Sequence, residues 1–172
     1  MKLILKTPPL HEPLTGDEVK AYLKLSSDDE DSFLPFLITA ARAHVESVTG
    51  RSLLKQIWTM EIKPPYPPSS PLVRLKGPEL EIRLPKPPLI EVLTVEAGNK
   101  SIPFTTSENS LKLSNNLWDQ DLTITYSAGY GDSAESLPPD LKFATLMATR
   151  FFYDGDITEL PLLHPYKVYR FI

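Results

Sequence analysis

Three histidines are the side chains best suited to metal binding or acid–base chemistry in this 172-residue chain: His11, His44 and His164. His44 has Glu46 close by, but residues two apart on a helix do not face each other. Neither a His-x-x-x-His nor a His-x-x-Glu spacing occurs, so a zinc site has little support. We therefore expect His44 to be a surface or interface residue and His164 to be a contact residue rather than a base.

Two further motifs resemble parts of known sites without completing them. Asp154-Gly155-Asp156 matches the start of a calcium loop but lacks the remaining ligands, which favours a solvated turn after a helix. Ser127-Ala128-Gly129-Tyr130-Gly131 follows a predicted strand, yet it has no Lys-Ser/Thr ending to hold a phosphate. Because no Gly-x-Ser-x-Gly elbow and no paired carboxylates occur either, we predict no catalytic residues, no metal, no cofactor and no enzymatic activity.

Composition narrows the function further. The formal net charge is −4 and no stretch is rich in Lys or Arg, so the basic face that grips DNA phosphates is missing. A mildly acidic wall would instead suit a passage through which DNA moves without sticking. The absence of cysteine excludes disulfides and thiolate sites, and no apolar run is long enough for a signal peptide or a membrane span. We expect a soluble, intracellular protein.

A short helix and a long amphipathic helix are predicted in the first third of the chain. Thr15 and Glu18 form a capping box at the start of a helix from Gly16 to about Leu23. The acidic run from Asp28 to Asp31 precedes the long helix. Its carboxylates either stabilise the helix by lying near the positive end of its dipole, or form a separate turn before it. Ser32 is the predicted N-cap, because Pro35 fits only in a first turn.

The long helix should bury one stripe and end at Thr49, with Gly50 as its terminating glycine. The stripe has the three- and four-residue spacing of a buried helix face and consists of Leu34, Leu37, Ile38, Ala41, Val45 and Val48.

Residues 53 to 130 change to the two-residue period of strands. Ten of the 18 prolines lie between Pro64 and Pro103, and they separate the predicted strands rather than interrupt them. We expect strands at 53–62, 79–84, 90–96, 101–104, 110–113 and 121–126. Gly98-Asn99 is the predicted hairpin turn between two of them. In 79–84, Leu80, Ile82 and Leu84 should point inward.

Helical spacing returns after Pro138-Pro139-Asp140 and continues to about Tyr153. The final segment is apolar and aromatic, and it has two alternative interpretations. It folds back and completes the core, or it extends and docks on a partner through aromatic and aliphatic anchors. The candidate anchors are Leu162, Leu163, Tyr166, Val168, Tyr169, Phe171 and Ile172.

These elements predict an α+β fold in one domain, residues 1–172. A small helical bundle (about 14–51 and 138–154), made of an N-terminal helix pair and a C-terminal helix, carries an inserted antiparallel β subdomain (about 53–130). A docking tail occupies about 160–172.

The ordered set of segments resembles the head–tail connector (adaptor, or head-completion) proteins of long-tailed bacteriophages and prophages. The segments are Glu12–Leu23, Leu37–Glu46 closing with Thr49-Gly50-Arg51, the strand around Gln56 and Trp58, Tyr126–Tyr130 followed by Leu137–Leu141, and Leu162–Lys167. Pro35 and the long proline-rich stretch from Pro64 to Pro88 depart from the family pattern.

The resemblance implies a structural protein of the virion neck that assembles in the host cytoplasm. It implies a ring of this protein, commonly of twelve copies, at the portal vertex, with the portal protein and the next head-completion or tail protein as partners. DNA would pass through without specific binding, with Asp28, Asp29, Glu30 and Asp31 as candidate channel-facing residues. The C-terminal segment would reach into the portal. Two alternatives stay open, namely another neck or tail-completion protein and a small ligand-binding or hydrolase domain.

Overall fold

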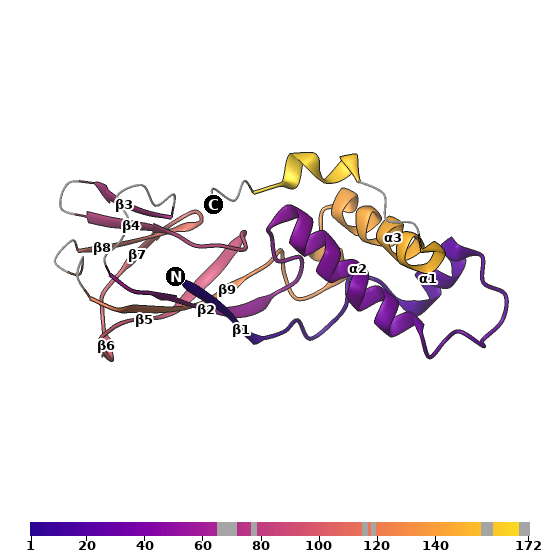
Figure 1. The fold of residues 1–172 in the computed structure, drawn as a ribbon, viewed down its shortest axis with the longest axis horizontal. Helices are drawn as coiled ribbons and strands as arrows, with labels where there is room; N and C mark the ends of the chain where they lie inside the picture. The colour runs from indigo at the N-terminus through magenta and orange to yellow at the C-terminus, as the bar shows by residue number, and fades with distance from the viewer. Residues whose placement is uncertain (65–71, 77–78, 115–116, 118–119, 156–159, 169–172) are drawn as a thin grey trace. The chain divides into compact units, whose positions relative to one another are not determined.

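A computed structural model describes residues 1–64, 72–76, 79–114, 117, 120–155 and 160–168. Contacts within the chain gather into two compact units. A β unit takes Met1–Pro8 and Lys55–Gly129, and a helical unit takes Pro9–Leu54 and, among the described residues, those from Tyr130 to Val168. The fold is mixed α+β, with helices and antiparallel sheets as expected (Figure 1).

The helical unit is built from α1 (Gly16–Leu23), α2 (Leu34–Thr49) and α3 (Pro139–Asp154), and all three pack against one another. Two 3-10 helices, η2 (Ala134–Ser136) and η3 (Pro161–Tyr166), flank α3 in sequence. The predicted capping box of α1 is present, because Glu18 N–H donates to Thr15 Oγ1 at 3.2 Å and Thr15 N–H donates to Glu18 Oε2 at 2.8 Å.

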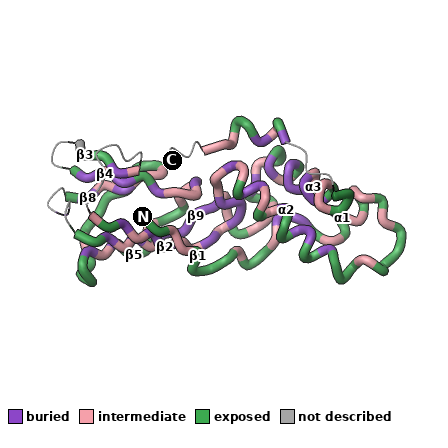
Figure 2. Tube along the Cα trace, in the orientation of Figure 1, coloured by how far each residue is buried: buried purple, intermediate pink, exposed green. Residues whose placement is uncertain are grey.

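The buried stripe of α2 is confirmed, and buried positions recur along the helix with its turn (Figure 2). Five of its six predicted members are buried, and Val48 is half-buried against the cluster that contains Ala41 and Val45. Gly50 ends the helix with φ +74°, as predicted. Pro35 lies in the first turn, but the N-cap is Phe33 rather than Ser32, since residues 28–33 form successive turns before the helix begins.

The β unit contains two antiparallel sheets whose buried residues form one core. The first sheet has the order β1-β2-β9-β5-β6, and the second has the order β3-β4-β8-β7. The strands are β1 (Lys2–Thr7), β2 (Gln56–Ile62), β3 (Val73–Lys76), β4 (Glu79–Arg83), β5 (Leu89–Ala97), β6 (Lys100–Ser101), β7 (Thr105–Ser107), β8 (Ser110–Ser114) and β9 (Leu122–Ala128). Leu80, Ile82 and Leu84 are buried in this core, as expected from their alternation.

The structure differs from the predicted strands at four places. β1 was not predicted, and it pairs with β2, with Leu3 opposite Met60. β3 was also not predicted. Leu53 and Leu54 do not belong to a strand but are buried in the core of the helical unit, and β2 begins at Gln56. The expected strand at 101–104 is replaced by β6 and β7, which lie in different sheets.

Candidate functional site

The predicted docking segment is folded back on the helical unit from Leu160 to Val168. Leu160 and Leu163 are buried in the same core as Ala41, Val45 and Leu141. Leu163 has 0% of its surface exposed, whereas Leu162 and Tyr166 are half-buried at the edge of that core. For these residues the structure shows the first of the two alternatives, in which the segment completes the core.

Two hydrogen bonds to the backbone of this segment hold its end at the C-terminus of α2. Val168 N–H donates to the Thr49 carbonyl at 2.7 Å, and Arg51 Nε donates to the Tyr166 carbonyl at 2.7 Å. A Cβ added to Gly50 would lie 3.4 Å from the Val168 carbonyl oxygen, so glycine permits this close approach. The helix terminus therefore provides a seat for the backbone of the last described residues.

A side-chain contact adds to this seat. The Tyr166 hydroxyl donates to Asp140 Oδ2 at 3.4 Å, at the start of α3. Partial burial and the nearby Asp140 carboxylate raise the pKa of Tyr166, so its hydroxyl stays a donor over the physiological range. Of the seven predicted anchors, Leu163 is fully buried, Leu162, Tyr166 and Val168 are half-buried, and Tyr169, Phe171 and Ile172 lie outside the described residues.

The acidic run between α1 and α2 is organised by Lys20. Its Nζ donates to Asp28 Oδ1 at 2.6 Å and to Asp31 Oδ1 at 2.7 Å. These hydrogen bonds lower the pKa of Asp28 and raise that of Lys20. No acidic residue lies in the first turn of α2, so dipole compensation does not explain the run, and the alternative of a separate turn is confirmed.

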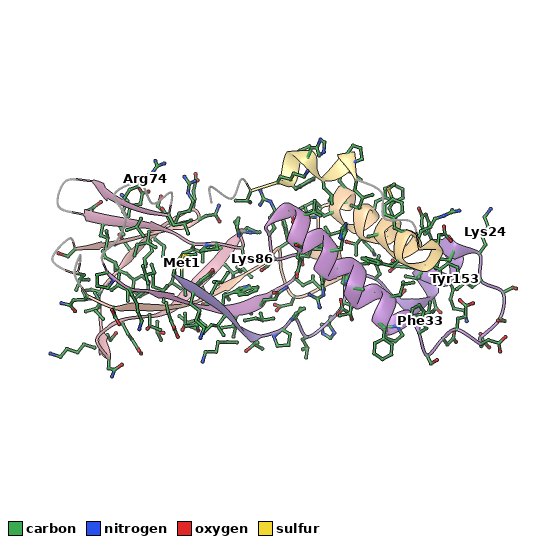
Figure 3. The ribbon with its side chains drawn as sticks, viewed as in Figure 1. Met1, Lys24, Phe33, Arg74, Lys86 and Tyr153 are labelled. Carbon is green, nitrogen blue, oxygen red and sulfur yellow. The ribbon has the colours of Figure 1, made fainter. Side chains whose placement is uncertain are left out.

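Glu30 joins the same end of the unit to α3, because it accepts a hydrogen bond from the Tyr153 hydroxyl at 3.1 Å. Figure 3 labels Tyr153 and Phe33 at this end. The run still presents more negative charge than Lys20 compensates, with one lysine for four carboxylates. Asp28 and Asp29 are exposed.

The histidines and the Asp154 motif do not come together in the described part of the structure. His44 is half-buried, and its ring packs edge-on against Phe152 with the ring centroids 5.6 Å apart. His11 and His164 are exposed. Asp154 pairs with Arg150 at 3.1 Å, and Asp156 lies outside the described residues. Within the described ranges, no group of three His, Cys, Asp or Glu residues is placed to hold a metal ion.

A polar network on α2 was not predicted. Arg42 Nε donates to Glu12 Oε2 at 2.7 Å and Arg42 Nη1 donates to Glu46 Oε2 at 3.1 Å, while Glu46 Oε1 accepts the Leu53 N–H at 2.9 Å. The i,i+4 spacing of Arg42 and Glu46 was its signal in the sequence. The network fastens the segment before α1 and the segment after α2 to the middle helix.

The sequence pattern of a family described as head completion protein matches residues 12–160. The chain belongs to this family. The match extends from Glu12 of the α2 network to Leu160 at the start of the folded-back segment. No curated protein matches. In the described part of this family member, no helix is long and apolar enough to cross a membrane.

Solved structures share the fold over the whole length of the family member. A chain from the neck of an empty gene transfer agent (GTA) particle, computed with C6 symmetry, has a TM-score of 0.73 and 18% identity, with 100% of this chain and 98% of that chain covered. A chain from the virion of the native particle gives 0.73 and 17% with the same coverage. A chain from the native neck computed with C12 symmetry gives 0.68 and 15%, again with 100% and 98% covered.

Proposed function

We propose that this head completion protein is a structural component of a virion neck, where it forms a ring at the portal vertex. The ring joins the DNA-filled head to the tail and extends the DNA channel. The observation that carries the proposal is the agreement between the family match over residues 12–160 and the shared fold, over both units, with a chain from a particle neck. A structural role, rather than a catalytic one, is consistent with membership of this family.

Binding to the portal tests the proposal. We expect the full chain to co-purify with the portal protein of its own particle and to appear as a ring on it by cryo-electron microscopy. A chain that stays unbound in the presence of assembled portal would contradict the proposal. Binding to a tail protein but not to the portal would favour another neck or tail-completion role.

The docking segment divides into two parts in this proposal. Leu160 and Leu163 anchor it to its own core, and the residues after Val168 are the part that reaches the portal. Deleting the residues after Val168 should abolish portal binding, while the buried Leu160 and Leu163 stay in the chain. Deletion from Leu160 onward is a poor test of docking, because it also removes buried leucines.

We propose that the acidic run from Asp28 to Asp31 lines the DNA passage. Its exposed carboxylates outnumber the one lysine that pairs with them, and negative charge repels phosphate. Replacing the exposed Asp28 and Asp29 with lysine should slow DNA exit from assembled particles without preventing assembly. DNA exit at the wild-type rate would place the run elsewhere in the ring.

A further inference from the structure

α2 carries a second stripe that faces away from the core. Its members follow the alternating three- and four-residue spacing of a helix-packing seam. We call them the outer stripe of α2: Phe33, Phe36, Ala40, Ala43 and Ser47. All five are exposed, and the two phenylalanines expose 51% and 70% of their surface. Phe33 lies one residue before the start of the helix, and Figure 3 labels it at this end of the helical unit.

The outer stripe of α2 also lacks charge. The charged side chains of α2 are Arg42 and Glu46, and both are turned into the polar network, where their side chains are only 12% and 10% exposed. An ordinary surface helix presents charged groups on the face opposite its core. An uncharged exposed face with two aromatic residues at one end and small residues at the other is typical of a surface on which another helix packs closely.

α3 offers a face of the opposite character. Phe143 exposes 50% of its surface and Arg150 is also exposed, while Met147 between them is half-buried and packs partly against the core of the helical unit. We call these three the outer stripe of α3. The rings of Tyr22 and Phe143 pack edge-on with their centroids 6.5 Å apart. Asp154 Oδ2 forms an ion pair with Arg150 Nε at 3.1 Å. This stripe therefore presents large side chains without uncompensated charge.

The exposed members of the two outer stripes lie outside the contact between α2 and α3. α2 and α3 pack together through their buried residues, among them Ala41, Val45, Ala144 and Ala148. The exposed residues of each stripe therefore remain available to a second copy. When the outer stripe of α2 in one copy contacts the outer stripe of α3 in a second copy, the first copy keeps its α3 stripe free and the second keeps its α2 stripe free. Such head-to-tail contacts repeat, and they generate rings when the rotation closes.

We propose that the outer stripe of α2 packs against the outer stripe of α3 of a second copy. Small residues on one stripe meet large ones on the other, and neither stripe brings an unpaired charge into the contact. This inference rests on the ring of the proposed function and names the surface that would join its neighbours. The rotational symmetry of the similar necks, C6 and C12, supports repetition of one contact between copies.

Cysteine cross-linking tests the pairing directly, because the chain contains no cysteine. The double variant Ala43→Cys/Arg150→Cys, treated with a flexible bismaleimide both as the free protein and bound to the portal, should give a ladder of covalent oligomers, because both positions are exposed. Each single variant should give no covalent dimer above the background of the parent chain. A dimer from Ala43→Cys alone would show that α2 meets α2, and a double variant without a ladder would exclude the contact; either result overturns the proposal.

A charge substitution separates this inference from the proposed function. Ala43→Arg keeps an exposed helix position that arginine accepts readily, so folding should be unaffected. We expect self-association to weaken at least tenfold, measured by analytical ultracentrifugation and by the number of copies per portal, while single copies still bind. Thr105→Arg on β7 is the exposed control. A complete ring formed by Ala43→Arg overturns the stripe contact although the proposed function stands, whereas failure of the parent chain to bind portal overturns the proposed function itself.

Discussion

Glu46 accepts the backbone N–H of Leu53 at 2.9 Å, so the side chain of a helix residue fixes the connecting segment that follows the helix. The other carboxylate oxygen of Glu46 accepts a hydrogen bond from Arg42, which also binds Glu12. Glu46 is only 8% exposed. A buried carboxylate charge destabilises the folded protein unless hydrogen-bond and ion-pair partners compensate for its lost hydration.

Arg42→Ala should therefore destabilise the protein. The substitution removes a cation that pairs with the buried Glu46 and leaves Thr39 Oγ1 as a donor from α2 to Glu12, at a cost of about 2–3 kcal/mol in the free energy of unfolding. Arg150→Ala is the matched control, because Arg150 forms an i,i+4 pair with Asp154 at the surface. Exposed pairs contribute about 0–1 kcal/mol. Urea denaturation of both variants measures the difference, and equal losses would show that the network is not a structural tie.

Leu163→Ala should show how much the folded-back segment contributes to the core. Leu163 is fully buried, and replacing a buried leucine by alanine costs about 2–5 kcal/mol through lost burial and the cavity that remains. Leu162→Ala, at the half-buried neighbouring position, should cost clearly less. Calorimetric melting of the two variants tests this. A negligible effect of Leu163→Ala would mean that the segment leaves the core in solution.

Local signals in the sequence predicted the helical unit well. Thr15 and Glu18 lie three residues apart, and a capping box is recognised from these two residue types at that spacing. The stripe of α2 and the glycine at position 50 are likewise local features. The predicted turn at Gly98-Asn99 is confirmed by positive φ angles of 53° and 67°. In each case the residues that decide the structure are neighbours along the chain.

Pairings between distant segments were not predictable in the same way. β1 becomes a strand because it pairs with β2, more than fifty residues later, and its sequence alone lacks a strand pattern that would single it out. Leu53 and Leu54 continue the apolar pattern of β2, yet they are buried in the helical unit. For the docking segment, apolar composition suits a core and a partner equally, so only the tertiary contacts of Leu163 distinguish the two.

Gly50→Ala should be destabilising for two reasons, and the same substitution at Gly155 distinguishes between them. Gly50 and Gly155 end α2 and α3 with nearly the same φ, +74° and +75°, where a side chain costs about 1 kcal/mol. Only at Gly50 would the new Cβ also meet Val168, 3.4 Å from its carbonyl oxygen. Gly155→Ala therefore measures the backbone strain alone. An equal loss of stability in both variants would indicate that the seat for Val168 tolerates the extra carbon.

Glu18 should make the stability of the helical unit depend on pH in the acid range. Lys142 Nζ donates to Glu18 Oε1 at 2.6 Å, and this hydrogen bond, together with that from the Thr15 N–H, lowers the pKa of Glu18 below its usual 4.5. A carboxyl group whose pKa is lowered by folding contributes stability above its unfolded pKa and loses it as pH falls through the folded value. Stability should therefore decline as pH falls below about 4.5.

Glu18→Gln tests this dependence because the amide oxygen still accepts the Thr15 N–H but no longer pairs with Lys142. At neutral pH the variant should lose less than about 1 kcal/mol, since both partners are partly exposed. Below pH 4.5 its stability should approach that of the parent chain, so the difference between the two narrows as the acid is titrated. Glu91→Gln, at an exposed position of β5, controls for the loss of one acidic group. A constant difference between Glu18→Gln and the parent from pH 7 to pH 3 would show that the ion pair does not set the acid response.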